Sequence, residues 1–199
     1  WIKNHYPHVF ACALLNSQPM GFYSSSQIIR DAENHGVKVK KICINRSNWD
    51  HSIEDSVNST FTLRLGFRQI KGLSSKDASE IINKRGNGYQ DPQDLLYRTQ
   101  INSLTIKLLI KANCFHYFDE NRRLLLWKTQ NTETEKPLAL FSNSPEEDYF
   151  IEKKVKLPEM TTGEKLILDY QALKLSLSTH PLKLLRPFIK KDFIKEYCR

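Results

Sequence analysis

The sequence predicts a mainly α-helical fold with a small β element, and three observations lead to this prediction. Apolar residues recur at the spacing of amphipathic helices over most of the 199-residue chain. Clean alternation of apolar and polar residues, the period of a half-buried strand, is confined to 61–68. Apolar residues make up 40% of the chain and aromatic residues 11%, which is enough to fill a core. We therefore expect one or two small folded domains.

Two helices are expected near the N-terminus. The first covers about 7–16, where Pro7 fits the first turn because its missing N–H would have no intrahelical partner there. The second covers about 27–35, with a serine from 24–26 as N-cap and Gly36 placed to end the helix in the left-handed conformation. Together they predict a short helix-turn-helix.

The β element is expected to consist of two strands. Residues 37–44 have the apolar pattern of a strand with one irregularity, and 61–67 alternate cleanly. A polar loop at 45–60 separates them, and we expect the two strands to pair across it.

After residue 70 the apolar period becomes helical, with capping serines at 74–75, a glycine break at 86–88 and an Asp91-Pro92 start signal. Residues 131–160 are rich in Glu, Asn, Thr, Ser, Pro and Lys with little periodicity, which indicates a linker or a loosely docked loop. The helices expected in this part of the chain cover about 75–84, 92–98, 103–112, 121–130, 162–175 and 181–188.

The chain is basic, with a formal net charge of +8 and a pI of about 9.3. A diffuse positive surplus suits a polyanionic partner, although many basic domains bind nothing anionic. No run approaches the roughly 18 apolar residues of a membrane span, so we expect a soluble, cytoplasmic protein with no membrane partner. Four scattered cysteines, Cys12, Cys43, Cys114 and Cys198, have neither zinc-site nor disulfide-framework spacing and are expected to be reduced.

The strongest local motif is the segment 70–78, Ile-Lys-Gly-Leu-Ser-Ser-Lys-Asp-Ala, which has the pattern of a helix-hairpin-helix. Glycine at 72 allows the backbone to turn tightly and approach a DNA phosphate, which the N–H groups of the following helix then face. Serine at 74 departs from the usual second glycine and is tolerable if its φ is negative. An ordinary helix connection is the alternative. The residues predicted to bind DNA here are Lys71, Gly72, Leu73, Ser74, Ser75 and Lys76.

Residues 101–115 resemble a second, degenerate copy of the hairpin that lacks its glycine. Taken alone this segment is explained by packing. As the partner of the first hairpin it makes a pseudo-symmetric pair, with Thr105 and Lys107 near the phosphates.

The sequence predicts no catalytic and no metal-binding residues. The carboxylates fall on expected polar helix faces or in loops rather than in a two-metal cluster, and no phosphate-binding glycine loop or metal-binding His pair is present. His180, which precedes Pro181, is expected to cap a helix or lie at the surface.

The run His-Tyr-Pro-His-Val-Phe-Ala-Cys-Ala-Leu-Leu-Asn-Ser-Gln-Pro-Met-Gly-Phe-Tyr at 5–23 resembles the C-terminal fingers of bacterial C-family DNA polymerases, the polymerase III alpha-subunit-like family, in its error-prone, translesion branch. The similarity continues at 35–37, 44–50 and 63–73, and again at 160–164 and 175–181. It therefore extends in order over nearly the whole chain.

The resemblance implies an internal fragment of a DNA-directed DNA polymerase that acts in DNA replication, repair and translesion synthesis. It implies the end of the fingers at 1–69, a tandem helix-hairpin-helix domain at 70–130, a linker at 131–160 and a helical segment at 161–199 that leads toward an OB-fold domain. Magnesium is implied for the full-length enzyme, held by aspartates with no counterpart here, so no cofactor is expected in this chain and the chain should be inactive alone.

The resemblance makes duplex DNA the expected partner, bound nonspecifically through phosphate contacts during template-directed primer extension. A stand-alone helix-hairpin-helix module of a repair protein is an alternative, and a protein-interaction scaffold of a mutagenesis complex is another.

Residues 136–141, Lys-Pro-Leu-Ala-Leu-Phe, form an apolar island in the polar segment. They resemble the clamp-binding peptides of bacterial polymerases, in which Leu138, Leu140 and Phe141 would enter a pocket of the sliding clamp. Pro137 stands where glutamine is usual. The alternative is that the three side chains dock on their own domain.

Overall fold

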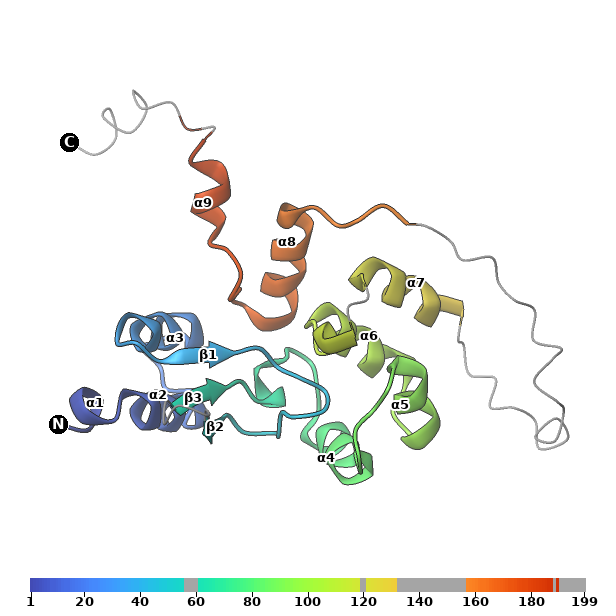
Figure 1. Cartoon of the computed structure of the whole chain (residues 1–199), viewed down its shortest axis with the longest axis horizontal. Helices are drawn as coiled ribbons and strands as arrows, with labels where there is room; N and C mark the ends of the chain where they lie inside the picture. Colours follow the sequence, from blue (N-terminus) through green and yellow to red (C-terminus); the bar gives the residue numbers. More distant parts are fainter. Residues whose placement is uncertain (56–60, 119–120, 132–156, 188, 190–199) are drawn as a thin grey trace, which may run out of the picture.

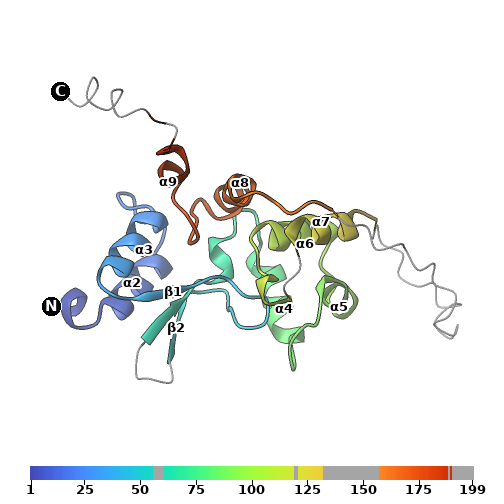
Figure 2. The same ribbon diagram turned by 45° about the horizontal axis from the view of Figure 1, so that its top comes forward.

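The computed structural model describes residues 1–55, 61–118, 121–131, 157–187 and 189. Its described part is mainly helical with one small sheet, so the predicted fold class is confirmed. Helices α1 to α3 and the sheet form one end of the molecule, helices α4 to α7 the other, and α8 lies beside α6 (Figures 1 and 2).

The N-terminal helices follow the predicted pattern closely. Helices α1 (Ile2–His5), α2 (Pro7–Asn16) and α3 (Ser25–Asn34) follow one another, and α1 was not predicted. Helix α3 begins two residues earlier than expected because Ser24 and Gln27 form a capping box, in which each side chain pairs with the other residue's backbone N–H. Gly36 has a φ of +81°, as the left-handed end of a helix requires.

The sheet corrects the prediction of two strands. It contains β1 (Lys38–Lys40), β2 (Ser52–Asp55) and β3 (Phe61–Arg64) in the order β1-β3-β2, with β1 parallel and β2 antiparallel to the central strand. Both expected strands are shorter than predicted, and the loop at 45–60 contains β2.

Long-range contacts explain these differences. After β1 the backbone leaves the sheet, and the N–H of Ile44 donates to the carbonyl of Cys114, beyond α6, at 3.0 Å. Strand β2 has only one large apolar residue and is held instead by Glu54, whose carboxylate accepts from Arg64 Nε at 2.6 Å and from Lys40 Nζ at 2.9 Å. These hydrogen bonds from Arg64 and Lys40 lower the pKa of Glu54 to about 2.

The remaining helices agree with the predicted ones to within three residues at each end. Helix α8 stops two residues early because Lys174 adopts a left-handed conformation with a φ of 60°. The elements are η1 (Phe67–Gln69), α4 (Ser75–Lys84), α5 (Pro92–Arg98), α6 (Ser103–Lys111), η2 (His116–Phe118), α7 (Arg122–Asn131), α8 (Thr162–Leu173) and α9 (Pro181–Leu185).

One hydrophobic cluster runs from Ala11 in α2 to Leu175 after α8, with Phe67 and Phe115 among its largest fully buried side chains. Described residues of 1–69, 70–130 and 161–199 all contribute to it. The division into four segments stays a prediction. Cys12, Cys43 and Cys114 are free and buried, and Cys198 lies outside the described residues.

Over the described ranges, no helix is long and apolar enough to cross a membrane.

Candidate nucleic-acid interface

The predicted hairpin is a tight turn between η1 and α4. The N–H of Leu73 donates to the carbonyl of Ile70 at 3.3 Å, and Gly72, the third residue of the turn, has a φ of +86°. A positive φ at this place is the hallmark of a type II turn and strongly favours glycine. Ile70 and Leu73 are buried on either side, so the core holds the ends of the turn while Gly72 is exposed.

The start of α4 has the geometry of an anion site. Ser74 is the N-cap, with a φ of −82°, and its hydroxyl accepts from the N–H of Asp77 at 3.0 Å. The φ of Ser74 is negative, which is the condition under which serine can replace the usual second glycine. In the described part of the chain the N–H groups of Ser75 and Lys76 have no acceptor, and the side chains of Lys71 and Lys76 are exposed. Two free donors and two cations thus lie near the positive end of the helix dipole.

The second hairpin joins α5 to α6 and lacks these features. Asn102 caps α6 by accepting from the N–H of Thr105 at 2.7 Å, so Asn102 and Thr105 hold the positions that Ser74 and Asp77 hold in α4. By the same correspondence, Leu104 replaces Lys76. This hairpin keeps the helix cap of the first one and lacks its glycine and its cation.

Thr105 does not lie where the sequence placed it. Its side chain is buried, and its hydroxyl donates to the carboxylate of Asp77 at 2.9 Å. The hydroxyl therefore joins the first turns of α4 and α6 rather than facing a phosphate. Lys107 lines a cavity between α6 and α7 together with Lys111, Arg123 and Trp127.

Helix α8 braces the hairpin, an interaction that sequence reasoning missed. The N–H of Lys71 donates to the carbonyl of Ala172 at 2.8 Å, and the side-chain amide of Gln69 donates to the carbonyl of Leu173 at 2.8 Å. Both acceptors belong to the last turn of α8, whose carbonyls have no partner within the helix. About a hundred residues separate the two sides of this interaction, and no local pattern signals it.

A buried ion pair holds α8 in this place. Arg122 at the start of α7 donates to Asp169 of α8 at 2.7 Å, and both side chains are only 10% exposed. Arg122 also donates to the carbonyl of Lys111 at the end of α6, and Asp169 accepts from the hydroxyl of Ser176 at 2.8 Å. The network ties α6, α7 and α8 together behind the hairpin.

Two further predictions concern metals and the apolar island. Within the described ranges, no group of three or more His, Cys, Asp or Glu side chains is arranged to hold a metal ion. Leu138, Leu140 and Phe141 lie outside the described residues.

Comparison with known proteins agrees with this geometry. A family profile described as "Helix-hairpin-helix motif" matches residues 36–125, which include both hairpins. Fold and profile together define a protein with a helix-hairpin-helix region, whose first hairpin has the glycine that the second lacks.

Proteins with similar sequences show which helix-hairpin-helix proteins this chain is related to. The chain is 44% identical over 189 residues to the error-prone DNA polymerase of Ruegeria pomeroyi, covering 95% of this chain and 17% of that protein. It is 42% identical over 199 residues to the error-prone DNA polymerase of Brucella abortus, covering 100% of this chain and 18% of that protein. It is 36% identical over 214 residues to error-prone DNA polymerase 1 of Rhizobium meliloti, covering 97% of this chain and 19% of that protein. The chain is therefore a homologue of one segment of the error-prone DNA polymerases, and it spans less than a fifth of the length of these relatives.

Proposed function

We propose that this chain is the part of an error-prone DNA polymerase that holds duplex DNA, without sequence preference, through phosphate contacts at the hairpin 70–76. The observation that carries the proposal is the positive φ of Gly72 at a turn that opens directly onto the N-terminus of α4. A phosphate oxygen placed there would accept from the N–H groups of Ser75 and Lys76, with Lys71 nearby.

Contacts of this kind position DNA and do not read its bases, because they reach only the backbone. Their strength should fall steeply with salt, since each neutralised phosphate releases counterions. The absence of a glycine and a cation in the second hairpin leads us to assign the phosphate contacts mainly to the first.

The relatives carry the name error-prone DNA polymerase and match this chain over a segment of their length. On that basis we propose that the whole protein extends DNA primers on a template, in repair and translesion synthesis in the bacterial cytoplasm. Magnesium would be held by residues outside this chain. The chain alone should then incorporate no nucleotide, and primer extension by the purified chain would refute this.

Duplex affinity measured by fluorescence anisotropy at several salt concentrations tests the proposal. We expect Gly72→Val and the double variant Lys71→Glu, Lys76→Glu to weaken binding equally for unrelated sequences. The double variant should flatten the dependence of log affinity on log salt by about one for each phosphate that is no longer neutralised.

The matched control is Lys38→Glu with Lys165→Glu, which makes the same charge change at two exposed lysines on β1 and α8. Equal losses of affinity in both double variants, together with full affinity in Gly72→Val, would show that net charge alone binds DNA and would reject the hairpin. Affinity that does not change with salt would favour the protein-interaction scaffold instead.

We further propose the sliding clamp as a partner of the apolar island that contains Leu138, Leu140 and Phe141. This proposal is supported by the sequence of the island alone, which resembles clamp-binding peptides. Titration of a labelled 133–144 peptide with the clamp should show saturable binding that a Leu140→Ala, Phe141→Ala peptide does not show. Equal binding of the two peptides, or none, would reject the clamp as its partner.

A further inference from the structure

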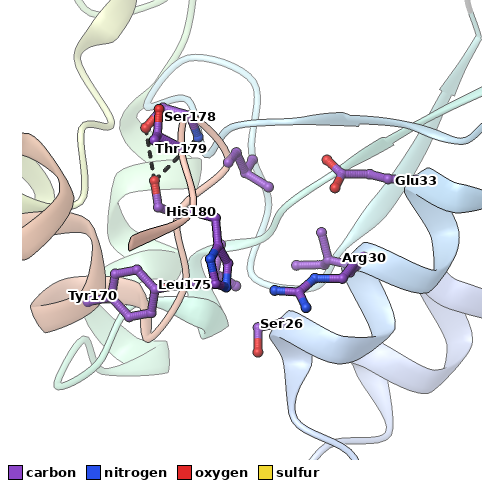
Figure 3. Close-up of a pocket in the computed structure, with 11 residues that line it drawn as sticks. Ser26, Arg30, Glu33, Tyr170, Leu175, Ser178, Thr179 and His180 are labelled. Carbon is purple, nitrogen blue, oxygen red and sulfur yellow. Dashed lines mark hydrogen bonds between the residues drawn. The ribbon is translucent and has the colours of Figure 1, made fainter. Parts of the chain in front are cut away.

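A cavity of about 200 Å³ lies between α3 and the segment 174–180 that follows α8. Figure 3 shows side chains from both sides of the cavity, with Arg30 and Glu33 on α3 facing Tyr170 and His180. Neither the hairpin nor its two lysines line it. The cavity is therefore separate from the interface described above.

His180 presents a hydrogen-bond donor to this cavity. Its Nδ1 accepts from the N–H of Leu182 at 3.3 Å, as the N-cap of α9. An imidazole whose Nδ1 is an acceptor carries its proton on Nε2. Figure 3 shows the imidazole ring of His180 and the guanidinium of Arg30 pointing toward each other across the cavity.

Arg30 brings a positively charged guanidinium to the cavity. Some arginines of the molecule form ion pairs, as Arg64 does with Glu54 and Arg122 with Asp169. Within the described ranges Arg30 has no ion pair and no hydrogen bond from its side chain. Glu33 also lines the cavity, one helical turn further along α3, so an anion would sit at the Arg30 end.

The opposite wall is held in place by the same network that docks α8. Ser176 donates to Asp169 at 2.8 Å, and the hydroxyl of Ser178 lies 2.9 Å from that of Ser176. The hydroxyl of the next residue, Thr179, has no partner in the described part of the chain. It adds a third donor beside Arg30 and His180, on a segment that the hydrogen bonds of Ser176 tie to α8.

We propose that this cavity binds a phosphate group, either of a nucleic-acid strand or of a free nucleotide. A guanidinium fork, an imidazole N–H and a hydroxyl are donors suited to a phosphate, and the guanidinium can donate two parallel hydrogen bonds. The volume exceeds the roughly 30 Å³ of one water several-fold, so a phosphate and a few waters fit. The proposal does not depend on the hairpin binding DNA.

The test compares three probes on the full chain: labelled single-stranded dT12, dATP without divalent metal, and inorganic pyrophosphate. We expect Arg30→Gln to weaken binding by roughly tenfold, the size expected for removing a hydrogen bond with a charged group. His180→Asn should also weaken it, because asparagine keeps the cap of α9 and lacks the Nε2–H. Arg46→Gln, at another exposed arginine, is the matched control and should have no effect.

The probes distinguish the two sources of phosphate. Weaker binding of dT12 alone assigns the site to a strand backbone, whereas weaker binding of dATP and pyrophosphate as well assigns it to free nucleotide. No binding of any probe, or equal weakening in Arg30→Gln and Arg46→Gln, overturns the proposal. Arg30→Gln should still weaken the binding of dT12 when it is combined with Lys71→Glu and Lys76→Glu. The experiment therefore tests the cavity and the hairpin independently.

Discussion

Replacing Asp169 by alanine should loosen the DNA-binding hairpin from a distance. The side chain of Asp169 is 10% exposed and pairs with Arg122, which is equally buried. Removing one partner of a buried ion pair leaves an uncompensated charge and costs about 3–5 kcal/mol. The missing hydrogen bond to Ser176 adds about 1 kcal/mol.

The consequence for the hairpin follows from two backbone acceptors. The carbonyls of Ala172 and Leu173 hold Lys71 and Gln69 only while α8 is docked. We therefore expect Asp169→Ala to weaken duplex binding, although it changes no residue that faces DNA.

Urea unfolding followed by circular dichroism, and duplex binding by anisotropy, measure the two effects. With an m-value of about 2–3 kcal/mol/M, the midpoint should fall by about 1 M or more. The double variant Arg122→Met, Asp169→Leu is the matched control, because apolar side chains of similar volume often replace a buried pair at no cost. It should recover most of the stability and of the DNA affinity.

Two results would refute this reasoning. A loss of stability below about 1 kcal/mol in Asp169→Ala would mean that the pair behaves as a solvated surface interaction. Unchanged duplex affinity, measured where Asp169→Ala is destabilised but folded, would mean that the hairpin keeps its geometry without α8.

Two further predictions test the core and the sheet. Gly66→Ala should destabilise the fold by about 1–3 kcal/mol, because a Cβ at 66 would overlap the backbone carbonyl groups of Trp49 and Asp50. Gly163→Ala on α8 places a Cβ that meets nothing within 4 Å, so this variant should be neutral or stabilising. Equal melting temperatures of the two variants would contradict this prediction. Because the pKa of Glu54 is lowered to about 2, its pairing with Arg64 stabilises the fold above the unfolded pKa near 4.5, and this stability is lost as pH falls toward 2. Glu54→Gln should therefore flatten the fall of the unfolding free energy at acid pH. An unchanged pH dependence in this variant would contradict the pairing.

The sequence by itself determined most of the helices and the intact hairpin. Helix starts are local events: Ser24, Ser74 and Thr161 each accept from an N–H three residues on, and a serine or threonine at that spacing is visible in the sequence. The hairpin glycine was predictable for the same reason, since a turn of four residues sets the φ of Gly72. The resemblance to error-prone DNA polymerases was also readable from short runs of residues, and the relatives agree with it.

Only the tertiary structure decided how these pieces meet. Strand β2 was missed because a short, polar strand owes its place to its neighbour β3 and to the ion pair of Glu54 with Arg64. Thr105 was misplaced because its partner Asp77 is 28 residues away and belongs to the other hairpin. The hydrogen bond between α8 and Lys71 could not be predicted from local sequence, because it joins backbone groups that nearly every residue carries. Only the packing of α8 against α6 brings these groups together.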